Sequence, residues 1–73
     1  MNPNNCSLKD FIRFLESHGC KMTRHHKGHK MFVNAKATRP ITIQDHVDPV
    51  PNMVIQSNLR TLGLTMKELR DFE

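Results

Sequence analysis

A chain of 73 residues can hold only one small hydrophobic core, and this sequence has little with which to build it. A domain of about this size buries only about 60% of the surface that its unfolded chain exposes. Trp and Tyr are absent, so packing depends on Phe and on a few Leu, Ile, Val and Met side chains. No apolar run approaches the roughly 20 residues that a membrane span needs. We therefore expect one thin, soluble domain.

The domain is predicted to begin with an amphipathic helix. Apolar residues recur at the spacing of a single helix face, at Leu8, Phe11, Ile12 and Leu15. Ser7 is a favourable N-cap, and Gly19 is suited to the left-handed position that ends many helices. Residues 1–6 are polar with an early Pro, and we interpret them as a flexible arm. A single domain is then expected over residues 7–73.

Three short β-compatible segments follow, at residues 20–24, 30–34 and 41–44. The basic connection 25–28 and the connection 35–40 are short enough for antiparallel hairpins. Alternation places Met31 and Val33 on one face of the second strand, and Lys30 and Phe32 on the other. We expect the methionines at positions 22, 31 and 53 to fill gaps in the core.

The C-terminal part of the chain is predicted to be helical. Two Pro and two Asp mark residues 45–51 as a loop, and a helix should open at Pro51 or Asn52 and end at Gly63. Thr65 and Glu68 then have the spacing of a capping box, which predicts a short last helix. The layout is α+β, an αβββα order in which a three-stranded antiparallel sheet has its helices packed on one face. The other face would be open to a partner.

The charges indicate that this partner is a polyanion. The formal net charge is +4, and residues 21–39 hold six cations and three His without a single Asp or Glu. A basic surface of this kind is typical of proteins that bind nucleic acid. The two cysteines, Cys6 and Cys20, make one weak candidate disulfide, and reduced thiols in a cytoplasmic protein are the preferred interpretation.

Three interpretations compete for residues 23–30, which contain His25, His26 and His29. In the first, a His acts as general acid or base on a ribose 2′-OH while neighbouring cations stabilise charge on the phosphate. In the second, His26 and His29 share a metal ion with His25 or a cysteine. In the third, the segment is an ordinary solvated basic turn. Gly28 favours the first, because it permits an unusual backbone angle or a close approach by phosphate.

Two further histidines lie outside this segment. His46 follows the third strand, where it could approach His29, although an exposed loop residue is the simpler interpretation. His18 lies at a helix C-terminus, where its charge suits the helix dipole.

Taken in order, these residues resemble the HicA family. The likeness runs from the helix at residues 9–16 through Gly19, Arg24 and Gly28-His29 to Phe32, and continues at later positions: Ile41-Thr42-Ile43, His46 and residues 59–65. It implies a double-stranded-RNA-binding-domain-like αβββα fold and a ribosome-independent mRNA interferase that a HicB antitoxin neutralises. The family's catalytic His falls on His29. Its motif is Gly-Ser-His, and this chain has Lys27-Gly28-His29.

We therefore expect a cytoplasmic endoribonuclease toxin that needs no cofactor and no metal. In this hypothesis His29 transfers protons, His46 is a candidate second group, and the RNA backbone contacts Lys21, Arg24, Lys27, Gly28 and Lys30. The partners are mRNA and a HicB-like antitoxin, and the chain alone is a monomer. The alternative is a non-catalytic RNA-binding module on the same fold, which reads the shape and phosphates of A-form RNA.

Overall fold

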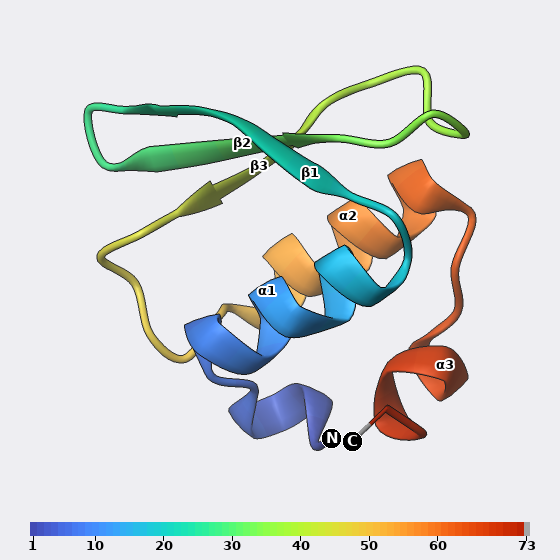
Figure 1. Cartoon of the computed structure of the whole chain (residues 1–73). Coiled ribbons are helices and arrows are strands. Elements are labelled where there is room, and N and C mark those ends of the chain that lie inside the picture. Colours follow the sequence, from blue (N-terminus) through green and yellow to red (C-terminus); the bar gives the residue numbers. More distant parts are fainter. Residues whose placement is uncertain (73) are drawn as a thin grey trace.

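The computed structural model describes residues 1–72 and confirms the α+β layout. Its elements, in chain order, are η1 (Pro3–Asn5), α1 (Leu8–Ser17), β1 (Lys21–His26), β2 (His29–Val33), β3 (Ile41–Gln44), α2 (Asn52–Leu62) and α3 (Met66–Arg70). The strands form one antiparallel sheet in the order β1-β2-β3. Figure 1 shows α1 and α2 on the same side of this sheet. We call the side away from the helices the outer face.

Helix α1 begins and ends where the sequence predicts. The Ser7 hydroxyl accepts a hydrogen bond from the Asp10 amide at 3.1 Å and so caps the helix. After Ser17 the chain turns through Gly19, whose φ is +86°. The Cys20 amide then donates to the carbonyl of Leu15 at 3.0 Å, which closes the last turn. The capped helix directs its buried face toward the sheet.

The helix-facing side of the sheet carries the core. Phe32, Ile41 and Ile43 are buried there, and they pack with apolar residues of the helices: Phe11, Phe14, Leu15, Ile55, Leu59 and Leu69. The alternation of β2 places Met31 and Val33 on the outer face instead. The prediction that the methionines fill the core was wrong: Met22 and Met53 are 54% and 82% exposed, and Met31 lies on the outer face, outside the core. Met53 lies in the first turn of α2, away from its buried stripe.

The hairpin between β1 and β2 is tighter than predicted. Its loop is only Lys27 and Gly28, with φ of +51° and +78°. Positive φ at both loop residues is the signature of a type I′ turn, which matches the twist of the flanking strands. His25 and His26, predicted to be in the loop, therefore belong to β1.

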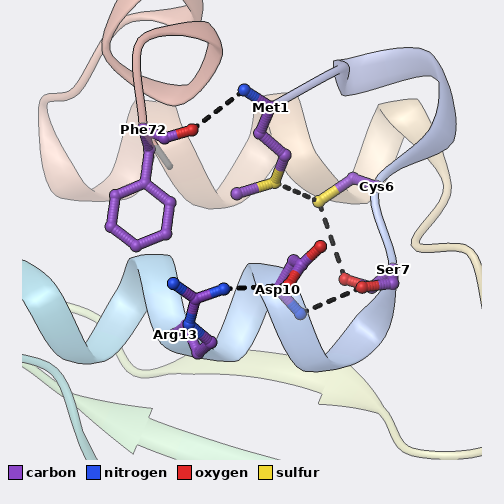
Figure 2. Close-up of polar contacts among 6 residues, drawn as sticks. All are labelled: Met1, Cys6, Ser7, Asp10, Arg13 and Phe72. Atoms are coloured by element: carbon purple, nitrogen blue, oxygen red, sulfur yellow. Dashed lines mark hydrogen bonds and ion pairs between the residues drawn. The ribbon is translucent and has the colours of Figure 1, made fainter.

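The first residues of the chain are packed, where the sequence predicted a flexible arm. Pro3–Asn5 form a 3-10 helix, and Cys6 is fully buried in the core. The Met1 ammonium donates to the carbonyl of Phe72 at 2.9 Å, and the Met1 sulfur lies 2.9 Å from Cys6 Sγ (Figure 2). The apolar side chain of Cys6 anchors this segment, although its neighbours are polar. Residues 7–72 share one core with it, and Glu73 lies outside the described residues.

The C-terminal helices also follow the prediction. Helix α2 begins at Asn52 after Pro51 and ends at Gly63, which has a φ of +71°. Thr65 and Glu68 form the expected capping box of α3. In residues 1–72, no helix has both the length and the apolar character that crossing a bilayer requires.

Candidate active site on the outer face of the sheet

His29 lies at the start of β2, exposed on the outer face. Its Nδ1 is 3.2 Å from the carbonyl oxygen of Lys27. A carbonyl can only accept, so Nδ1 carries the proton of this hydrogen bond. In the neutral ring, Nε2 is then the unprotonated nitrogen. The turn therefore presents His29 in a form whose Nε2 can take a proton.

His26 lies directly opposite His29. The two residues are paired across β1 and β2 and flank the Lys27-Gly28 turn. Directly opposed residues have Cβ atoms about 4.5–5.5 Å apart and side chains on the same face. Sequence reasoning did not find this pair, because it placed His26 in the loop. Recognising Lys27-Gly28 as a two-residue hairpin loop would have revealed it.

Both imidazoles line one hollow of about 370 Å³ on the outer face. We call it the basic hollow; its lining residues are Arg24, His26, Lys27, His29, Met31 and Thr42. Among residues 1–72, the lining contains two permanent cations and no carboxylate. Such a surface attracts an anion and leaves both imidazoles free of a competing acidic partner.

The predicted RNA-binding cations do not all lie here. Arg24 and Lys27 line the basic hollow, and Gly28 lies in the turn beside it. Lys21 pairs with Val33 at the other end of the hairpin. Lys30 lies on the helix-facing side, where it lines a separate hollow with Leu8 and Ile12. The alternation of β2 separates Lys30 from His29.

His46 belongs to a different cluster, centred on Asp45. The Asp45 carboxylate accepts a hydrogen bond from His25 Nε2, and its other oxygen is 3.8 Å from His46 Nδ1. The hydrogen bond from His25 lowers the pKa of Asp45; the nearby charges of His25, Lys30 and His46 act the same way, and partial burial opposes them. The Asp45 amide also donates to the carbonyl of Gly28 at 2.8 Å. This cluster fastens the turn to the end of β3.

His46 therefore lies beside the turn but does not line the basic hollow. A Cβ added to Gly28 would be 3.4 Å from His46 Nδ1, which shows how close the loop approaches. His46 thus lies with Asp45 at the side of the turn, 3.8 Å from its carboxylate.

A second hollow, of about 330 Å³, opens at the other side of His29. It lies between β3 and the start of α2, and we call it the valine pocket. Its lining residues are His29, Thr42, Ile43, Gln44, Val47, Val50, Pro51 and Val54. His29 and Thr42 line both hollows. The site is thus basic on one side of His29 and mainly apolar on the other.

Metal ligands do not converge in this region. Within residues 1–72, no group of three His, Cys, Asp or Glu side chains could hold a metal ion. Cys6 and Cys20 are free thiols buried in the core, so neither joins the histidines of the hairpin.

Comparisons with known proteins give no relatives for this chain. No family model and no curated protein matches the sequence, and no solved structure matches the fold. The function is therefore inferred from the chemistry of the site.

Proposed function

We propose that this protein is an endoribonuclease, the HicA-like toxin of a toxin–antitoxin pair, and that it cleaves mRNA without a metal ion. The observation that carries the proposal is the basic hollow, in which His26 and His29 face each other beside Arg24 and Lys27. Two imidazoles and two cations without a carboxylate suit the cleavage of a phosphodiester that supplies its own nucleophile, the ribose 2′-OH.

The reaction divides two proton transfers between the two histidines. His29 Nε2 removes the proton from the 2′-OH as the O2′–P bond forms. Protonated His26 gives a proton to the 5′-oxygen as the P–O5′ bond breaks. The products are a 2′,3′-cyclic phosphate and a 5′-OH end. Arg24 and Lys27 stabilise the negative charge that develops on the phosphate oxygens in the transition state.

The RNA backbone follows the outer face in this proposal. Lys27 and Arg24 hold phosphates at the basic hollow, and Lys21 holds one further along β1. The missing side chain of Gly28 lets the backbone approach the turn. Lys30, on the helix-facing side, has no direct role in RNA binding.

A HicB-like antitoxin is proposed to cover the same face. A partner with acidic residues would complement Arg24 and Lys27, and such complementarity gives fast and specific association. Lys27→Glu should therefore weaken the binding of both RNA and antitoxin. Unchanged affinity for both would contradict a shared face.

The alternative function is RNA binding without cleavage. The exposed cations of the outer face support it as well as they support catalysis, whereas the opposed histidines favour the enzyme. The two functions predict different fates for RNA in the cell.

Induced expression in a bacterial host tests the proposal. Wild-type protein should arrest growth and fragment total mRNA, and His29→Ala should do neither. His18→Gln is the matched control, because His18 is an exposed histidine outside both hollows. It should behave as wild type. Equal effects of wild type and His29→Ala, with intact mRNA in both, would contradict the enzyme.

A further inference from the structure

The valine pocket has the size and the lining of a small-molecule site. Its volume of about 330 Å³ lies at the lower end of the roughly 300–1,000 Å³ found for ligand pockets. Val47, Val50 and Val54 provide apolar walls, and Thr42 and Gln44 add polar groups. Apolar walls with a few polar groups that fix the ligand's orientation are typical of small-molecule pockets.

The position of the pocket indicates which part of an RNA could enter it. His29 and Thr42 line both the pocket and the basic hollow, so a nucleotide whose phosphate lies in the hollow can reach the pocket with its base. Phosphate and ribose are too polar for a wall of valines. A nucleobase has apolar faces and a hydrogen-bonding edge, and the Thr42 hydroxyl and the Gln44 amide can pair with that edge.

We propose that the valine pocket binds one unstacked nucleobase of the RNA at the cleavage site. This inference rests on the proposed function and adds the substrate class: single-stranded RNA. A base inside a duplex is stacked and paired, so it cannot enter the pocket without the cost of extrusion. The pocket also separates the enzyme from a duplex-binding module, which reads phosphates and 2′-OH groups without extracting a base.

A scan with abasic oligonucleotides measures directly whether one base of the RNA contributes to binding. The probe is a 2′-O-methyl octanucleotide, which lacks the nucleophile and is not cleaved, with one base removed at each position in turn. Binding to the full chain is followed by fluorescence anisotropy. Wild-type protein should lose about tenfold in affinity, about 1.4 kcal/mol, at one position, and much less elsewhere.

Paired variants test whether the pocket causes that loss. Val54→Trp fills the pocket and should remove the position-specific effect. Met53→Trp is the matched control, since Met53 is the preceding residue of α2 and is 82% exposed outside the pocket. It should keep the effect. Val47→Thr, in the loop, makes an apolar wall polar without adding bulk, so it gives the same answer if Val54→Trp fails to fold.

The outcomes distinguish the pocket from the enzyme. Equal losses at every position in wild type, or a loss that persists in both pocket variants, would overturn the pocket. The proposed function would survive either result if His29→Ala still abolished cleavage of unmodified RNA. No binding of any octanucleotide would contradict both.

Discussion

Gly28→Ala tests whether the backbone of the turn shapes the site. Gly28 has a φ of +78°, and an alanine in the left-handed region costs about 1–2 kcal/mol. The substitution also restricts the unfolded chain, which raises the free energy of unfolding by about 0.4–1 kcal/mol. The new Cβ would lie 3.4 Å from Asp45 Oδ1 and His46 Nδ1, at ordinary contact distance, so crowding adds little. We expect a net loss of about 1 kcal/mol, or about 4–8 °C in Tm.

Gly63→Ala is the matched control for this prediction. Gly63 has a φ of +71°, and within residues 1–72 no atom beyond its neighbours in the chain lies within 4 Å of the position of its missing Cβ. Urea unfolding should therefore give the two variants the same loss of stability within about 0.5 kcal/mol. RNA cleavage should separate them: Gly28→Ala displaces the turn that holds His29 and loses about 10- to 100-fold, whereas Gly63→Ala keeps wild-type activity. The reasoning would be refuted if Gly28→Ala left the free energy of unfolding unchanged, or if it lowered that free energy by several kcal/mol more than Gly63→Ala does.

Three further predictions concern buried or paired groups. Asn58 is 8% exposed, and its Nδ2 has no partner within residues 1–72, so Asn58→Leu should raise the free energy of unfolding by about 1 kcal/mol; a lower urea midpoint would contradict this. Burial raises the pKa of Cys6 from 9.0 to about 11. The contribution of the neutral thiol to the free energy of unfolding is therefore complete below pH 9 and is lost as pH rises toward 11. Urea unfolding from pH 7 to 10.5 should show this loss in wild type and less of it in Cys6→Ala. The hydrogen bond from His25 lowers the pKa of Asp45. The contribution of the ionised carboxylate to the free energy of unfolding is therefore complete above the ordinary pKa of 3.8, and it is lost as pH falls through the lowered pKa. Asp45→Asn should lack that part of the acid dependence, and identical acid unfolding of the two proteins would count against the cluster.

The elements with strong local signals were predictable from the sequence. Helix α1 begins after Ser7 and ends before Gly19, and α3 begins with the capping box of Thr65 and Glu68. These ends were predictable because capping depends on side chains within a few residues of the helix end. Ile41–Gln44 was predicted with its observed bounds. Local interactions of this kind do not require knowledge of the tertiary fold.

The rest depends on contacts that a linear pattern does not contain. Residues 1–6 were predicted to be a flexible arm because they are polar. A long-range hydrogen bond from the Val50 amide to the Cys6 carbonyl, at 2.8 Å, holds them in place. Met22 and Met53 read as core because they are apolar, but their positions in β1 and α2 expose them.

The candidate site shows the same division. The residue types of the basic segment and the unusual backbone angle of Gly28 were predictable from the sequence. The pairing of His26 with His29 was not, because a turn that begins at Lys27 and not at His25 moves His26 into a strand. The valine pocket lies between β3 and the start of α2, and only the fold brings these segments together.

Cleavage of a labelled single-stranded RNA by the purified chain, in the presence of a chelator, tests the central claim most directly. We predict fragments ending in a 2′,3′-cyclic phosphate with wild-type protein, a 10²- to 10⁴-fold slower reaction with His29→Ala, and a wild-type rate with His18→Gln. RNA that is bound but intact with the wild-type protein would contradict the enzyme and leave the RNA-binding module as its function.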